Sequence, residues 1–260
     1  MALVLVSEPG PVRTITLNRP EQRNAVSIGM QGELIAAFGE SAKDPECRVL
    51  IIRGAGRDFC AGADLGDIAR ARTGSDGIRL GRLLEDLMEA IASHPVPVIA
   101  QVHGAALGAG CQLVVACDLA VAAADARLGI PSARLGALIG YQSLQRLVMA
   151  VGPKRAGHML YSGRIVSGEE AAAWGMVNEA VDAEILAART DVLAAAIAEG
   201  APLSVRGSKR GIATVRDLAS SDPSRRRDFD TMWAQALASD DLEEGLRAFR
   251  DRRKPRFRGT

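Results

Sequence analysis

Two turns rich in glycine and alanine carry the residues best suited to chemistry. The first spans residues 59–65 and follows a strand-like run, Val49–Ile52; the second spans residues 103–113 and follows Val96–Val102. Small residues let a ligand approach the backbone closely. The second turn runs into a helical pattern, whose first N–H groups lack acceptors and lie at the positive end of the helix dipole. One N–H from each turn would stabilise a negative carbonyl oxygen, as an oxyanion hole does. Tight packing would explain either turn alone, but the occurrence of both turns in this order favours a ligand-binding site.

Other kinds of site find little support in the sequence. The three histidines show no HExxH spacing and the four cysteines no CxxC pair, so we expect neither a metal site nor a disulfide framework. No G-x-S-x-G or Walker A sequence is present, and the glycines Gly54 and Gly56 lack the third glycine of a dinucleotide fingerprint.

Composition excludes further classes of function. Lys and Arg number 32 against 31 Asp and Glu, which leaves +1 and no overall field to attract nucleic acid or an anionic membrane. The apolar run Gly104–Ala122 approaches the length of a membrane span, but its glycines and Asp118 divide it into a loop, a short buried helix and a strand. The N-terminus lacks the features of a signal peptide. We expect a cytoplasmic protein without nucleic-acid or membrane partners.

The elements that position these turns alternate between strand and helix patterns. Strand-like runs occupy 12–17, 49–52, 96–102 and 119–122, and Ser27 is placed to cap a helix with an apolar face. Strands separated by helices indicate an α/β fold with much parallel sheet. From about residue 184 the pattern is helical. We therefore divide the chain into an α/β core, residues 1–200, and a helical region, residues 201–260, that ends in a basic tail.

Several segments, in order along the whole chain, resemble the crotonase (enoyl-CoA hydratase/isomerase) superfamily. They are Thr16–Pro20, Arg23–Ala25, Phe59–Leu65, Pro97–Ala100, Gly104–Gln112, Cys117–Asp118, Gln145–Leu147 and Arg253–Phe257. The resemblance implies a spiral of ββα units with a C-terminal helical trimerisation region. It also implies a homotrimer or a dimer of trimers that binds acyl-CoA, with coenzyme A as part of the substrate and no separate cofactor.

The resemblance also assigns site residues. The thioester oxygen would accept hydrogen bonds from the backbone N–H groups of Ala63 and Ala109. Residues expected along the CoA moiety are Arg23, Asn24, Ala25, Ala61, Gly62, Asp64 and Leu65. Lys254 and Phe257, in the basic tail, would contact its nucleotide end.

The sequence departs from the family pattern at the acid–base positions. Hydratases of this family use two glutamates, which fall here on Gln112 and Ser132. A position that carries aspartate in other branches falls on Gly140, and the following Tyr141 is a further candidate to touch the acyl group. Neither Gln112 nor Ser132 exchanges a proton readily near pH 7, so we expect weak or absent hydration.

Three functions remain open at this point. The chain is nominally an enoyl-CoA hydratase or isomerase of fatty-acid metabolism, which would make it a lyase or isomerase. Alternatively it is a thioester decarboxylase or hydrolase that uses the oxyanion hole with a different acid. The third possibility is an acyl-CoA-binding protein without turnover.

Overall fold

The computed structural model describes residues 2–70, 75–135 and 137–216, and from the C-terminal part residues 240–241, 244, 248, 251, 253, 255–256 and 258–260. Its main sheet has six strands in the order β1-β2-β3-β4-β6-β9. These strands are β1 (Val4–Val6), β2 (Val12–Leu17), β3 (Val49–Gly54), β4 (Val98–Val102), β6 (Leu119–Ala123) and β9 (Glu179–Val181). Only β1 pairs antiparallel with its neighbour; the other pairings in this sheet are parallel.

A second, three-stranded sheet has the order β5-β7-β8. Its strands are β5 (Ala105–Leu107), β7 (Arg127–Gly129) and β8 (Ile165–Ser167), with β5 and β7 parallel. The α-helices are α1 (Ile28–Lys43), α2 (Leu65–Arg70), α3 (Ser75–Ala92), α4 (Ala109–Ala116), α5 (Tyr141–Val151), α6 (Pro153–Ser162), α7 (Gly168–Trp174), α8 (Leu186–Ala198) and α9 (Pro202–Arg216). Short 3-10 helices are η1 (Pro20–Gln22), η2 (Ser132–Leu135) and η3 (Ala183–Ile185).

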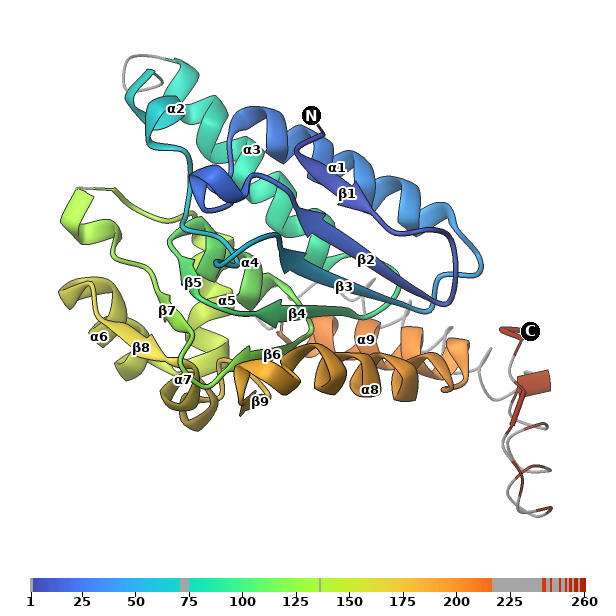
Figure 1. Cartoon of the computed structure of the whole chain (residues 1–260). Helices are drawn as coiled ribbons and strands as arrows, with labels where there is room; N and C mark the ends of the chain where they lie inside the picture. Colours follow the sequence, from blue (N-terminus) through green and yellow to red (C-terminus); the bar gives the residue numbers. More distant parts are fainter. Residues whose placement is uncertain are drawn as a thin grey trace.

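Both faces of the main sheet are buried, which explains why its central strands are largely apolar. Along β3, Leu50 and Ile52 join the main core, while Val49 and Ile51 pack with Ala194 of α8 on the other face. This alternation is the two-residue period of a strand. Figure 1 shows α1 and α3 on one side of the sheet and α8 on the other.

The α/β class expected from the sequence is confirmed. Strand β2 has the bounds predicted for it, and the Oγ of Ser27 caps α1 by accepting a hydrogen bond of 3.2 Å from the N–H of Met30. The division of Gly104–Ala122 into separate pieces is also correct, but its first piece is a short strand, β5, that was expected to be a loop. A strand of three residues shows too little alternation to be recognised.

Helix α9 is anchored to the core by an ion pair whose lysine is buried. The Nζ of Lys209 lies 2.7 Å from an Oδ of Asp118 and also donates to the carbonyl oxygen of Val96 at 3.0 Å. Burial of Lys209 lowers its pKa, although the facing Asp118 opposes that shift. Asp118 thus has a structural partner. The proposed domain boundary at residue 200 lies just before α9, the helix that this ion pair attaches to the sheet.

Candidate functional site

Strands β3 and β4 deliver the two glycine- and alanine-rich turns to one edge of the sheet. The strands are parallel neighbours, so the chain leaves both at their carboxyl ends. Backbone hydrogen bonds then join the turns. The N–H of Cys60 donates to the carbonyl oxygen of Ala105 at 2.8 Å, and the N–H of Leu107 donates to the carbonyl oxygen of Cys60 at 2.9 Å. The packing is so close that a Cβ on Gly110 would lie 2.9 Å from Cys60 Cβ. The turns predicted to act together therefore lie side by side.

A glycine with positive φ precedes each proposed oxyanion-hole residue. Gly62 has φ +124° and Gly108 has φ +53°, a region that favours glycine, and a Cβ on Gly108 would lie 3.7 Å from Gly62 Cα. The next residues are Ala63 and Ala109. Within the described part of the chain, neither alanine N–H has a hydrogen-bond acceptor, although the flanking N–H groups of Asp64 and Gly108 are bonded. Two unused donors thus lie on adjacent turns, as an oxyanion hole requires.

The cysteines around these turns are suited to packing rather than to nucleophilic attack. All four are free thiols, and Cys60 and Cys111 are fully buried. Burial raises the pKa of each of these two thiols to about 12. A thiolate is the reactive form, so neither would be a nucleophile near neutral pH.

The loop proposed to follow the CoA moiety is held in an uncommon backbone conformation. Arg23 and Asn24 have φ values of 54° and 56°, both in the left-handed region. Asn24 is fully buried. Its side-chain amide donates to the carbonyls of Ala55 and Asp58 at 2.8 and 2.7 Å, and its oxygen accepts from Arg19 N–H at 2.9 Å. Asn24 therefore holds the loop through contacts within the protein.

This loop pairs directly with the first turn. The N–H of Ala61 donates to the backbone carbonyl oxygen of Arg23 at 2.9 Å, and a parallel β-bridge joins Val26 to Ala63. The segment from Arg23 to Ala25 and the turn from Ala61 to Leu65 were both assigned to CoA, and they lie side by side.

Asp64 and Leu65 lie where that turn enters α2. One Asp64 oxygen accepts from the N–H groups of Gly66 and Asp67, and the other lies 2.8 Å from Arg19. The guanidinium of Arg19 lowers the pKa of Asp64. The side chain of Leu65 is exposed. Asp64 thus acts as a turn residue, whereas Leu65 is free to contact a ligand.

Asp58 is a positioning residue that the sequence analysis missed. Its carboxylate is buried, accepts from Arg23 Nε at 2.7 Å and from Ala105 N–H at 2.8 Å, and also contacts Arg57. Hydrogen bonding from Arg23 lowers its pKa to about 2. A single carboxylate thereby joins the CoA loop to the start of β5. No motif marked it, because its partners are 35 and 47 residues away in sequence.

Gln112 and Ser132 approach the second turn from different elements. Gln112 lies on α4, one turn after Ala109, and is 5% exposed; its Oε1 is buried without a hydrogen-bond partner among the described residues. Ser132 begins η2, three residues after Gly129, whose carbonyl accepts from Gly108 N–H at 2.8 Å. Because β5 and β7 pair in parallel, the helices that follow them, α4 and η2, begin at the same end of the small sheet.

The remaining candidates belong to other segments of the chain. Tyr141 begins α5 and is largely exposed, and Gly140 caps that helix without a side chain. Lys254 and Phe257 lie outside the described residues. In the described part of the C-terminal tail, a Cβ on Gly259 would lie 3.6 Å from Pro202 of α9. Figure 1 places the C-terminus at the opposite end of the molecule from α2.

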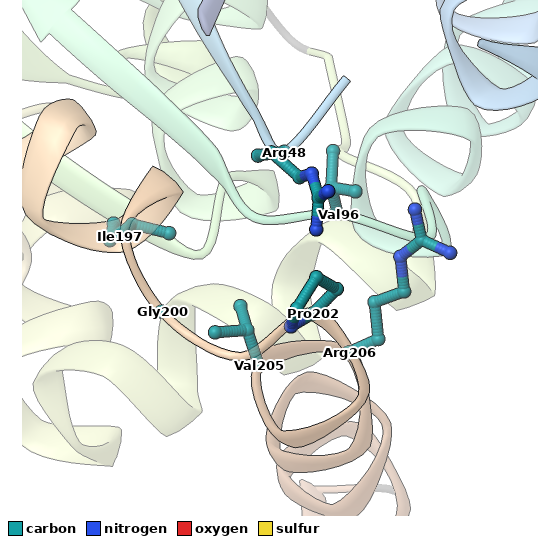
Figure 2. A pocket seen from close by; sticks show the side chains of 7 residues that line it. All are labelled: Arg48, Val96, Ile197, Gly200, Pro202, Val205 and Arg206. Carbon is teal, nitrogen blue, oxygen red and sulfur yellow. The ribbon is translucent and has the colours of Figure 1, made fainter. Parts of the chain in front are cut away.

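A small hollow between α8, α9 and the residues before β3 and β4 is distinct from the paired turns. It is lined by Arg48, Val96, Ile197, Gly200, Pro202, Val205 and Arg206 (Figure 2). Its volume is about 10 Å³, which admits about one water molecule. This hollow is too small for an acyl chain.

Among the described residues, no three His, Cys, Asp or Glu side chains lie together as ligands for a metal ion. No described helix combines the length and apolar character needed to cross a membrane.

The sequence matches the family model of enoyl-CoA hydratase/isomerase over residues 8–260. A mevalonyl-coenzyme A hydratase of Aspergillus fumigatus is 35% identical over 98% of this chain and 94% of its own length. A 2,3-dehydroadipyl-CoA hydratase of Escherichia coli is 32% identical, with complete coverage of both chains. A probable enoyl-CoA hydratase of Bacillus subtilis is 35% identical over 95% of each.

Solved structures of similar proteins share the whole fold. An enoyl-CoA hydratase/carnithine racemase from Magnetospirillum magneticum superposes with a TM-score of 0.93 at 31% identity, covering 100% of this chain and 97% of that one. An enoyl-CoA hydratase from Bacillus anthracis gives 0.91 at 31% identity and covers both chains completely. The crotonase-type fold expected from the sequence is therefore confirmed.

Proposed function

Because the chain belongs to the enoyl-CoA hydratase/isomerase family, we propose that it binds acyl-CoA thioesters and polarises their carbonyl oxygen between Ala63 and Ala109. The observation that supports this most is the pair of unused N–H donors on two hydrogen-bonded turns. Ala109 also begins α4, whose dipole favours negative charge at that point. The oxygen becomes more negative when the thioester forms an enolate, so these donors bind the enolate more tightly than the thioester.

The CoA moiety follows the paired segments that lead to this oxygen. One side of this path consists of two paired segments, Arg23–Ala25 and Ala61–Leu65, and the side chain of Leu65 is exposed beside it. The resemblance also assigns Lys254 and Phe257 to the nucleotide end, and both lie outside the described residues. Coenzyme A arrives as part of the substrate, and the reaction uses no additional cofactor.

The nominal activity is that of an enoyl-CoA hydratase or isomerase, with hydration weak or absent. Hydration needs one group to deprotonate water and one to protonate the α-carbon, and a positioned acid or base contributes typically 10²–10⁴-fold. Gln112 and Ser132 supply neither group near pH 7. Stabilisation of an enolate does not depend on them, because it uses only the backbone donors.

Two alternatives keep the same ligand. A decarboxylase or hydrolase would use the oxyanion hole with another acid, and a binding protein would hold acyl-CoA without turnover. Absorbance loss from crotonyl-CoA distinguishes hydration from both alternatives. Product analysis after incubation with malonyl-CoA then distinguishes decarboxylation or hydrolysis from binding alone.

Titration calorimetry tests the proposal directly. Butyryl-CoA should bind clearly more tightly than butyrate, because only the thioester offers both the polarisable oxygen and the CoA moiety. Free CoA serves as the control that separates the contribution of the acyl group. Equal affinity for butyryl-CoA and butyrate would contradict acyl-CoA binding.

A further inference from the structure

Helix α3 directs two carboxylates toward α5. Glu85 Oε1 accepts a hydrogen bond of 2.7 Å from Ser143 Oγ, and Glu89 Oε2 lies 2.7 Å from Nη2 of Arg146. Glu89 is thus neutralised by a buried arginine. No cation among the described residues pairs with Glu85, whose only side-chain partner there is a neutral hydroxyl.

The Glu85 carboxylate fills the space that a side chain at position 140 would occupy. A Cβ on Gly140 would overlap the carboxylate, and Glu85 Cγ lies 2.7 Å from that Cβ position. Glycine at 140 is therefore what allows a carboxylate from α3 to reach the start of α5.

Helix α5 belongs to the same group of packed helices as α4, which carries the oxyanion-hole donor of Ala109. Helix α4, which begins at Ala109, packs against both α3 and α5. Gln112 on α4 is 5% exposed and leaves its Oε1 without a partner among the described residues. The expected acid–base positions 112 and 132 hold no carboxylate, whereas the α3–α5 contact beside α4 does.

We propose that Glu85 is the proton-transfer group of the acyl-CoA site; this inference rests on the proposed function. The Glu85 carboxylate takes a proton from the α-carbon of the bound thioester. As that C–H bond breaks, its electron pair moves into the carbonyl, and the enolate oxygen is held by the N–H groups of Ala63 and Ala109. The resulting carboxylic acid exchanges its proton with solvent and returns one to the α-carbon.

One carboxylate of this kind supports proton transfer at the α-carbon without addition of water. The inference therefore predicts exchange of α-hydrogens in a saturated acyl-CoA, even where hydration of an enoyl-CoA is weak.

The experiment follows deuterium incorporation into butyryl-CoA in D₂O by mass spectrometry. Glu85→Gln keeps a hydrogen-bond acceptor for Ser143 and should lower the exchange rate by at least about 100-fold, because a positioned base is worth typically 10²–10⁴-fold.

Two variants act as controls. Glu89→Gln removes the other α3 carboxylate that contacts α5, and exchange should remain close to that of the unmodified protein. Ser143→Ala removes the hydroxyl partner but leaves the base, so exchange should persist. Thermal melts and butyryl-CoA titrations establish that each variant folds and binds.

The outcomes separate this inference from the proposed function. Failure of the unmodified protein to bind butyryl-CoA would overturn both. Binding without exchange, or full exchange in a folded and binding Glu85→Gln variant, would overturn the role of Glu85 alone. Loss of exchange in Glu89→Gln to the same extent would show that the α3–α5 contact acts structurally, and it would equally refute that role.

Discussion

Ala109 is expected to serve the site through its backbone N–H, so its substitutions divide into those that keep this donor and those that remove it. Proline removes the N–H but is tolerated at the first position of a helix, which Ala109 occupies in α4. Ala109→Pro should weaken butyryl-CoA binding by about fivefold, since a neutral hydrogen bond contributes about 1 kcal/mol. Titration calorimetry measures the change. Ala109→Gly keeps the donor and should bind like the parent; equal loss in both variants would contradict the role of the N–H.

The second prediction at the residue scale concerns the missing acids. Gln112→Glu combined with Ser132→Glu should raise crotonyl-CoA hydration well above the parent. The gain should exceed that of either single change, because one group deprotonates water and the other protonates the α-carbon. Loss of enoyl absorbance is the measurement, after each variant is shown to fold and bind. Efficient hydration by the unmodified protein would overturn the interpretation of these two positions.

At the scale of elements, long-range polar contacts hold the loops that carry the site. Asp58 joins the Arg23 loop to the start of β5, and Asn24 joins it to the segment after β3. These contacts compensate for the left-handed backbone at Arg23 and Asn24, which costs of order 1–3 kcal/mol for each residue. The loops are therefore expected to respond to loss of Asp58 more than the sheet does.

Asp58→Asn should lower the free energy of unfolding by about 2 kcal/mol at pH 7. Arg23 lowers the folded pKa of Asp58 to about 2, below its unfolded value of about 4, so its stabilisation is complete above that unfolded pKa. This stabilisation declines as pH falls, and about half of it remains at pH 3. Urea unfolding at pH 7 and pH 3 measures the difference. Exposed Asp125→Asn is the control; a pH-independent difference for Asp58→Asn would refute the ionic contribution.

At the scale of the whole molecule, the expected assembly has support on the described surface. Helix α9 exposes Ile212 at 68% and Val215 at 64%. Exposed apolar side chains on one helix are typical of protein interfaces. The C-terminal region of the sequence adds the apolar residues Met232, Trp233 and Leu237, which lie outside the described residues.

We expect light scattering to give a trimer or a dimer of trimers at micromolar concentration. Ile212→Lys combined with Val215→Lys should shift the mass toward smaller species, because two charges would be buried without partners. Leu5→Lys, on the exposed edge strand β1, is the matched control and should leave the mass unchanged. A monomeric parent would contradict the assembly.

The sequence by itself determined the α/β class, the strands of the main sheet that are long enough to show a pattern, and the two turns with the order of their residues. Strand β2 and the cap at Ser27 are local: they follow from β-branched residues and from one hydroxyl placed before an apolar face. The family pattern supplied Ala63 and Ala109 as candidates because their turns have a distinctive composition.

Only the tertiary structure brought together residues with no local signal. Strands β5, β7 and β8 have three residues each and exist because they pair with one another. Asp58 meets Ala105, and Glu85 meets Ser143 against Gly140, across 47 and 58 residues of sequence. A carboxylate acquires its role from the charges, donors and space around it. Those surroundings are assembled by parallel pairing and helix packing, which a linear pattern does not encode.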